Sequence, residues 1–271
     1  MLKIGILGVG AIGRTIATAL DQKSGQKQID AELVALSDQD RAGAEALSSE
    51  LSSHPAVLSI EEMIERSELA VEAAGQAALP EFVPQALARG RDMLIMSVGG
   101  LLGREEWFHQ AEKKGCRIYV PSGAIAGLDG IKSASVGRIE SAELTSRKPI
   151  AALKGSKYVV DRGLQLDSFK EDTVIFEGSA EEAARAFPAT SNVAASLRLA
   201  VDPAAAVRVR IVAVPGGSEN VHEIRVQGEF GKLTVKVENV PSKSNPRTSQ
   251  LAAFSAIATL KNLTRSLRVG T

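Results

Sequence analysis

The first half of the chain alternates short apolar runs with stretches whose apolar residues recur at helical spacing. The apolar runs predict buried strands over residues 2–7, 32–37, 69–74, 92–97 and 116–120. The stretches between them predict helices, the first from residue 12 to Ser24-Gly25 and the others over residues 44–51, 80–89 and 105–114. Strands that alternate with helices favour a parallel sheet covered on both faces.

The rhythm changes after about residue 125. Strands are predicted over residues 136–146, 173–176, 206–214, 220–227 and 232–240, and helices over residues 181–186 and 192–201. The last three strands follow one another without a helix, which is typical of an antiparallel sheet with helices on one face. A final helix over residues 249–263 is apolar on most sides, so we expect it to be buried against the first domain.

The segment Gly8–Gly13 (GVGAIG) fits the pattern G-x-G-x-x-G, directly after the first strand and at the start of a helix. Gly8 permits a tight turn, Gly10 lets a pyrophosphate approach the backbone, and Gly13 lets the helix pack close to the strand. The amides of the first helical turn then face the phosphate charge. The cofactor-binding candidates of this motif are Gly8, Gly10, Ala11, Ile12 and Gly13.

These patterns together predict an α/β protein with three segments. Residues 1–124 form a Rossmann dinucleotide-binding domain with a doubly wound parallel sheet, and residues 125–245 form an α+β domain. Residues 246–271 carry the C-terminal helix back to the first domain. The length of 271 residues fits about two domains.

Asp38 follows the second strand, 25 residues after Gly13, near the usual offset of the acid that bonds the ribose 2′-hydroxyl. A carboxylate there favours NAD over NADP, a preference that Arg41 can soften; a solvated loop aspartate is the alternative. The ends of the next strands supply further candidates for the nicotinamide ribose, although turn geometry alone also explains their glycines. These candidates are Ala74, Gly75, Ser97, Val98 and Gly99.

The three histidines differ in their surroundings. His54 and His109 lie in polar segments and are expected at the surface. His222 lies in an apolar strand with Ile224 and Val226 on the same face, where it is either a hydrogen-bonded structural histidine or a catalytic one.

Other candidate residues of the second half allow two interpretations each, one as part of a ligand site and one as purely structural. Ser122 and Ala124 lie in a small-residue segment that either approaches a ligand or only links the domains. Arg147 and Lys148 could hold a dicarboxylate or end a solvated strand. Asn192 and Thr248 each precede a helix and could bind a ligand or only cap that helix, a role open to Ser249 as well.

Charge and cysteine content exclude several classes of function. Lysines and arginines number 32 and acidic residues 32, so the chain has no electrostatic footprint for nucleic acid or an anionic membrane. One cysteine, Cys116, allows no intrachain disulfide, and with three histidines it makes a zinc site improbable. No apolar stretch reaches 18 residues. We therefore expect a cytoplasmic protein without a metal, membrane or nucleic-acid partner.

Several motifs appear together in a characteristic order: the fingerprint, residues 121–129 (PSGAIAGLD), 146–149 (SRKP), 187–188 with 192–195, 220–224 (NVHEI) and 245–249 (NPRTS). In this combination the whole chain resembles the NAD(P)-dependent L-aspartate dehydrogenases. One departure is Thr190-Ser191, ahead of Asn192, which leaves details of cofactor contact open.

The resemblance implies interconversion of L-aspartate with oxaloacetate and ammonia through iminoaspartate, which can feed pyridine nucleotide biosynthesis. It places His222 at the catalytic position and Ala124 and Asn192 beside the cofactor, NAD or NADP. It also implies a homodimer or larger assembly, in which residues 125–245 serve substrate binding and dimerisation. Ser122, Arg147, Lys148 and Thr248 are the candidates for binding the substrate.

Two alternatives remain. Another two-domain NAD(P)-dependent dehydrogenase, of the semialdehyde or homoserine type, has the same architecture. Acylating aldehyde dehydrogenases are disfavoured because Cys116 is predicted to lie in the core. A non-catalytic NAD(H)-sensing protein would need a partner-binding module, for which we find no basic helix or charge asymmetry.

Overall fold

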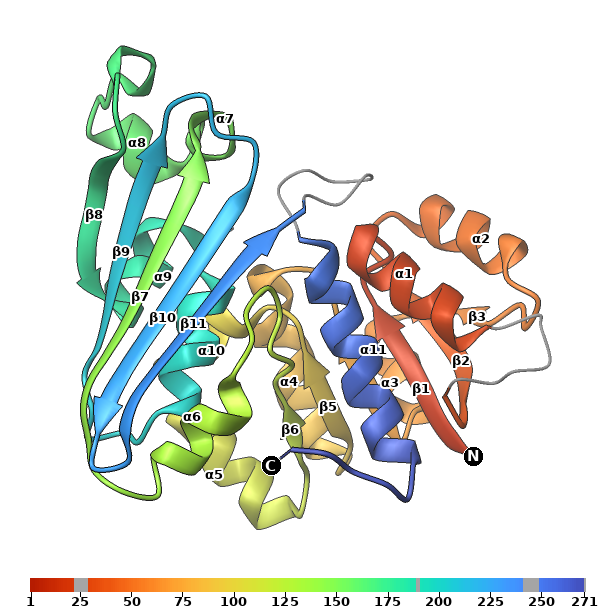
Figure 1. Ribbon diagram of the computed structural model, residues 1–271. Helices are drawn as coiled ribbons and strands as arrows, with labels where there is room; N and C mark the ends of the chain where they lie inside the picture. Colours follow the sequence, from red (N-terminus) through yellow and green to blue (C-terminus); the bar gives the residue numbers. More distant parts are fainter. Residues whose placement is uncertain (22–28, 189–190, 241–248, 271) are drawn as a thin grey trace. The chain divides into compact units, whose positions relative to one another are not determined.

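The protein folds into two compact units (Figure 1). The computed structural model describes residues 1–21, 29–188, 191–240 and 249–270. The first unit combines Met1–Pro121 with Ala253–Val269, and the second combines Ser122–Ala252 with Gly270.

The first unit contains a six-stranded parallel sheet in the order β3-β2-β1-β4-β5-β6. Its strands are β1 (Leu2–Leu7), β2 (Ala31–Ser37), β3 (Ala56–Val57), β4 (Leu69–Glu72), β5 (Asp92–Ile95) and β6 (Ile118–Tyr119). Its helices are α1 (Ala11–Leu20), α2 (Arg41–Glu50), α3 (Ile60–Arg66), α4 (Leu79–Ala88) and α5 (Glu105–Lys114), with short 3₁₀ turns η1 (Gln76–Ala78) and η2 (Val98–Leu101). The strand order reverses beside β1, which confirms the predicted doubly wound sheet.

Burial explains why the strands of this sheet appear as apolar runs. Ile4 and Ile6 of β1 are fully buried, as are Ala70 and Val71 of β4. A parallel sheet covered by helices on both faces has no solvent-facing side, so apolar residues occupy both faces. The segment that follows α1, at Ser24-Gly25, lies outside the described residues.

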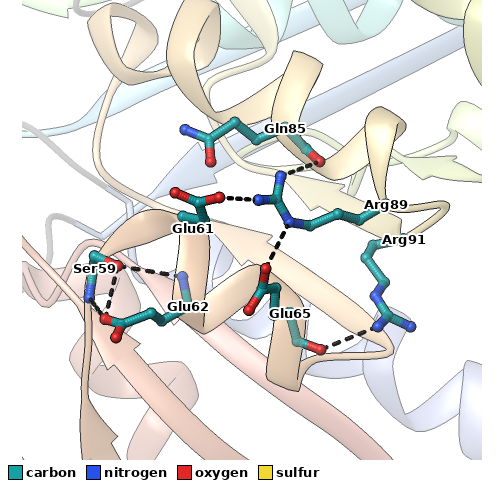
Figure 2. A network of polar contacts seen from close by, with 7 residues as sticks. All are labelled: Ser59, Glu61, Glu62, Glu65, Gln85, Arg89 and Arg91. Atoms are coloured by element: carbon teal, nitrogen blue, oxygen red, sulfur yellow. Dashed lines mark hydrogen bonds and ion pairs between the residues drawn. The ribbon is translucent and has the colours of Figure 1, made fainter.

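Helix α3 was not predicted, although its sequence carries a start signal. The Ser59 hydroxyl accepts from the Glu62 amide while the Glu62 carboxylate accepts from the Ser59 amide, a reciprocal capping box. Figure 2 shows how Arg89, just after α4, reaches across to α3 and pairs with Glu61 and Glu65. These ion pairs connect helices α3 and α4, which both pack against β4.

The second unit contains a five-stranded sheet in the order β11-β10-β7-β9-β8. Only the β7–β9 pair is parallel among these strands, so the predicted, mostly antiparallel sheet is confirmed. The strands are β7 (Ile139–Pro149), β8 (Thr173–Ser179), β9 (Val207–Val214), β10 (Asn220–Gly228) and β11 (Gly231–Asn239). The helical segments are α6 (Leu128–Ala134), α7 (Ile150–Leu153), α8 (Lys157–Asp161), η3 (Leu166–Ser168), α9 (Ala180–Ala186) and α10 (Asn192–Ala200).

Alternation along the strands separates the two faces of this sheet. On β9, Val207, Val209 and Ile211 are buried, while Arg208 and Arg210 are solvent-exposed. Helices α9 and α10 pack on β8 and β9. The sheet therefore has an inner face that carries its core and an outer face of charged side chains.

Two predicted strand boundaries were wrong for identifiable reasons. Strand β4 ends at Glu72, two residues early, because the Glu72 carboxylate accepts the amides of Ala74 and Gly75 and turns the chain. Strand β7 begins at Ile139 because α6 and its closing turn use the preceding residues.

The final helix, α11 (Gln250–Thr264), confirms the predicted return of the chain to the first unit, which it joins from Ala253 onward. Ala256 and Leu260 are fully buried. Phe254, however, is 48% exposed, so the helix is buried along one stripe rather than on most sides.

Candidate active site

The glycine-rich turn after β1 is compact on its inner side and open at its tip. Gly8 has φ +94°, and a Cβ there would lie 2.5 Å from the backbone of Ala73. A Cβ on Gly13 would lie 1.8 Å from the carbonyl oxygen of Gly8, whereas one on Gly10 would meet no atom within 4 Å. The turn therefore requires glycine at two positions for packing and leaves free space above the third, where a phosphate would approach.

Helix α1 begins directly at this turn. Ala11 and Ile12 are its first two residues, and both are half-buried. Because they lie in the first turn, their backbone amides have no acceptor within the helix. An anion placed over Gly10 would meet these amides and the positive end of the helix dipole.

Asp38, at the end of β2, is tied to the same turn. One carboxylate oxygen accepts from the Val9 amide at 2.7 Å, and the other accepts from the Asp40 amide at 2.8 Å. Arg41 is engaged with Glu45 at 2.9 Å. The negative charge that would meet the adenosine ribose is thus held in place by the fingerprint loop itself.

Sequence reasoning missed Glu72, the fully buried last residue of β4. Its carboxylate accepts the amides of Ala74 and Gly75 at 2.8 Å each. It also accepts the Ser97 amide at 3.0 Å and the Ser97 hydroxyl at 2.8 Å. Burial raises the pKa of Glu72, although these hydrogen bonds oppose the rise. The sequence signal that could have identified Glu72 is its position at the end of an apolar run, just before Ala-Ala-Gly.

The remaining first-unit candidates surround this carboxylate. Gly75 has φ +109° and directly precedes η1, while Val98 and Gly99 are buried at the start of η2. Glu72 thus joins the carboxyl ends of β4 and β5, the edge at which ligands bind in open parallel sheets.

In the second unit, the inner face of the sheet carries His222. It is 3% exposed, and its Nδ1 lies 2.9 Å from the Ser146 hydroxyl of β7, its partner across the antiparallel pair. Burial and the neighbouring charge of Lys148 lower the pKa of His222 to about 3. The imidazole is therefore neutral at pH 7, and His54 and His109 are exposed as predicted.

Lys148 lies on the same face, two residues along β7 from Ser146. It is 5% exposed, and burial lowers its pKa to about 8. Within the described residues no carboxylate pairs with it. Arg147 faces the other way, where it is exposed and bonds Asp172 at 2.9 Å. Strand alternation thus separates the two cations that the sequence suggested as a pair.

Two other candidates of the second unit, Ala124 and Ser249, are connected through Asn239 at the end of β11. The Ala124 carbonyl accepts from the Asn239 side-chain amide at 2.9 Å, and Asn239 in turn accepts from the Ser249 hydroxyl. Ser249 also accepts the Leu251 amide, in keeping with a capping role. Ser122 is half-buried.

Asn192 is the first residue of α10, and Ser191 rather than Asn192 occupies the capping position. Thr248 lies outside the described residues.

Other kinds of site find no support in the described ranges. No group of three or more histidine, cysteine or acidic side chains there could hold a metal. No described helix has the length and apolar character to cross a membrane. Cys116 is buried, and burial raises the pKa of its thiol, so it is core as predicted rather than a nucleophile.

Two family models match the chain. The model for the C-terminal part of aspartate dehydrogenase matches residues 129–263, and the model for the NAD-binding domain of homoserine dehydrogenase matches residues 8–121.

Relatives align over the full length of the chain. An L-aspartate dehydrogenase from Methanosarcina mazei is 48% identical over 100% of both chains, and one from Bradyrhizobium diazoefficiens is 38% identical over 100% of this chain and 94% of its own. The crystal structure of aspartate dehydrogenase from Thermotoga maritima covers 100% of both chains with a TM-score of 0.76 and 27% identity. A myo-inositol dehydrogenase from Lactobacillus casei, at 16% identity, 97% and 84% coverage and a TM-score of 0.57, shares the fold. With 48% identity over its entire length, the chain belongs to the L-aspartate dehydrogenase family.

Proposed function

We propose that this protein is an L-aspartate dehydrogenase, which deaminates L-aspartate oxidatively and reversibly to oxaloacetate and ammonia with NAD or NADP. The observation that carries the proposal is the buried group of Ser146, Lys148 and His222 in a chain that also has the dinucleotide fingerprint. A buried cation without a carboxylate partner among the described residues suits an anionic substrate, and the neutral imidazole beside it can accept a proton.

The first unit fits the cofactor. The space above Gly10, the amides of Ala11 and Ile12 and the carboxylate of Asp38 would hold the pyrophosphate and the adenosine ribose. When bound, the oxidised nicotinamide takes up hydride from the substrate. The segments braced by Glu72, which contain Ala74, Gly75, Ser97, Val98 and Gly99, are proposed to line the nicotinamide ribose. Ala124 and Asn192 are further candidates for cofactor binding on the strength of the family resemblance.

The second unit supplies binding and proton transfer. Lys148 would hold a substrate carboxylate, with Ser122 and Thr248 as further ligands, whereas Arg147 on the outer face has no such role. If the Nδ1–H of His222 donates to Ser146, the Nε2 lone pair is free to act as a base. A carboxylate beside Lys148 offsets the charge that depresses the pKa of His222, which makes the imidazole a better base once substrate is bound.

The steps follow from this arrangement. The α-amino group must be neutral before hydride leaves Cα as iminoaspartate forms. Water, activated by His222, then adds to the imine carbon, and the resulting carbinolamine collapses to oxaloacetate and ammonia. His222 would carry the protons of these last steps.

The alternatives have less support. The homoserine dehydrogenase model matches only the nucleotide-binding half, and residues 129–263 match the aspartate dehydrogenase model instead. A non-catalytic NAD(H) sensor would have no use for a buried Lys148 and His222, whose burial is unfavourable for folding.

The proposal extends to a homodimer in the cytoplasm that supplies iminoaspartate to pyridine nucleotide biosynthesis. The family resemblance supports the assembly and the pathway, and the single cysteine suits a reducing compartment. Light scattering of the purified protein would measure the mass of the assembly.

The test of the function is absorbance at the reduced-nicotinamide band with L-amino acids and either NAD or NADP. We expect reduction with L-aspartate alone, reversed by oxaloacetate and ammonia. Semialdehydes and homoserine form the comparison panel, and turnover with one of them but not with L-aspartate would contradict the proposal.

His222→Ala should lower kcat by about 10²- to 10⁴-fold, the range typical of a lost acid–base group. His109→Ala is the matched control, because His109 is exposed on α5 and should leave kcat unchanged. Full turnover by His222→Ala would remove the catalytic assignment.

A further inference from the structure

Asn220, the first residue of β10, has a buried hydrogen-bond acceptor that the fold does not use. The side chain is 6% exposed, and its amide oxygen Oδ1 has no partner among the described residues. Buried side-chain acceptors are nearly always satisfied, so one left open in a functional region needs an explanation.

Its cross-strand neighbour Asn239 shows the contrast. The two residues are paired across β10 and β11, and both are buried. Asn239 uses both ends of its amide, since Nδ2 donates to the Ala124 carbonyl and Oδ1 accepts from the Ser249 hydroxyl. Both polar ends of the Asn239 side chain are thus used in hydrogen bonds within the protein, whereas the Asn220 oxygen is available to accept a hydrogen bond from a ligand.

The strand register places Asn220 with the proposed catalytic group. Residues two apart on a strand share a face, so Asn220 lies on the inner face with His222. Strands β10 and β7 pair His222 with Ser146 and Val221 with Arg147, and Asn220 and Lys148 are the next residue of each strand beyond these pairs. An unused acceptor and an unpaired cation therefore lie at neighbouring positions of one buried surface.

These two groups are complementary to the two ends of an amino acid. The ammonium of Lys148 only donates hydrogen bonds and attracts a carboxylate, while Asn220 Oδ1 only accepts them. An α-amino group is a donor, and the iminium formed from it keeps N–H donors and gains positive character.

We propose that Asn220 Oδ1 accepts a hydrogen bond from the substrate's α-amino group and from the imine nitrogen that replaces it, while Lys148 binds a carboxylate. Asn220 is then a specificity-determining residue for α-amino over unsubstituted dicarboxylates. This inference rests on the proposed function.

The unsatisfied oxygen makes a distinctive prediction about stability. A polar group that serves the fold destabilises the protein when it is removed, but removing an unsatisfied buried acceptor relieves a desolvation penalty. Asn220→Leu should leave the melting temperature unchanged or raise it, whereas Asn239→Leu should lower it.

The test compares ligands with and without an amine. For the wild type and Asn220→Leu, we would measure KM for L-aspartate, the inhibition constant of succinate and the Kd of NADH. We expect the KM for L-aspartate to rise about ten- to a hundredfold in Asn220→Leu, the range for a lost hydrogen bond to a charged group. The succinate constant and the Kd of NADH should stay within about twofold, because succinate lacks the amine.

The outcomes separate this inference from the proposed function. If the wild type oxidises L-aspartate but Asn220→Leu keeps its KM, or weakens succinate equally, the role of Asn220 is refuted and the function stands. A lower melting temperature with weaker binding of every ligand, NADH included, would make Asn220 structural. No oxidation of L-aspartate by the wild type would overturn both.

Discussion

Lys148 shows at the scale of one residue how the proposed substrate site opposes stability. Burial lowers its pKa from 10.5 to about 8, which lowers the free energy of unfolding at pH 7 by about 3 kcal/mol. The sign follows from the lowered pKa, because the folded protein binds this proton more weakly than the unfolded chain does. The penalty is complete below pH 8 and fades as the pH rises from 8 to 10.5.

Lys148→Met should therefore stabilise the protein at neutral pH by up to about 3 kcal/mol and lose most activity. Urea unfolding at pH 7 and pH 10 measures the gain, which should shrink at the higher pH. Lys232→Met, on an exposed lysine of β11, serves as the control and should be nearly neutral. A destabilised Lys148→Met at pH 7 would contradict the burial penalty.

The lowered pKa of Lys148 also predicts that the binding of dicarboxylates depends on pH. A dicarboxylate such as succinate binds the protonated form, so its affinity should fall as the pH rises through about 8. Calorimetric titration of the wild type should show this decline, and Lys148→Met should lack it.

We propose that Asp38 governs the choice between NAD and NADP through one fixed charge. Asp38→Asn keeps an oxygen for the Val9 amide but removes the repulsion of a 2′-phosphate. We expect the ratio of kcat/KM for NADP over NAD to rise about ten- to a hundredfold, since a hydrogen bond to a charged group such as this carboxylate contributes about 1.5–3 kcal/mol. Asp30→Asn, on an exposed aspartate before β2, should leave the ratio unchanged.

At the scale of elements, Glu72 joins the ends of β4 and β5. The four hydrogen bonds to its carboxylate fix the Ala74–Gly75 turn and the Ser97 turn relative to each other. A glutamine keeps the shape of the side chain but places an amide donor against at least one of those donors.

Glu72→Gln should weaken NADH binding about tenfold, as expected for one buried hydrogen bond lost, while the succinate constant changes little. Fluorescence titration of NADH measures the effect. In the wild type, NADH affinity should fall as the pH decreases through the raised pKa of Glu72, because protonation also displaces a donor. This acidic decline should be absent from Glu72→Gln. Unchanged NADH affinity in Glu72→Gln would show that the brace does not shape the cofactor site.

At the scale of the whole molecule, the first unit is assembled from both ends of the sequence. Helix α11 supplies the fully buried Leu260 to it, more than 130 residues after Pro121. Leu260→Ala should lower the free energy of unfolding by about 2–5 kcal/mol. Trp107, the only tryptophan and buried in α5, reports this unfolding by fluorescence. Leu267→Ala, at a site 75% exposed, should have almost no effect, and equal results for the two variants would contradict the assignment of α11 to this unit.

The sequence alone determined those features that depend on neighbours along the chain. Apolar runs predicted the parallel strands because both faces of that sheet are buried, and the glycine spacing predicted the turn because Gly8 and Gly13 have no room for a side chain. Period-two alternation singled out His222 among three histidines. Short elements such as β3, α7 and α8 escaped prediction because so few residues carry too weak a periodic signal.

The tertiary structure decided which distant residues meet. Lys148 and Arg147 are adjacent in sequence, and alternation along β7 turns them to opposite faces of the sheet. Only the folded structure shows that Lys148 lies beside His222 and that Arg147 bonds Asp172. In the sequence, Glu72 is only one acidic residue at the end of an apolar run. The structure shows that Ser97, which follows β5, donates hydrogen bonds to its carboxylate. The open acceptor of Asn220 is visible only once its neighbours are placed, because hydrogen-bond satisfaction depends on atoms that lie close in space and far apart along the chain.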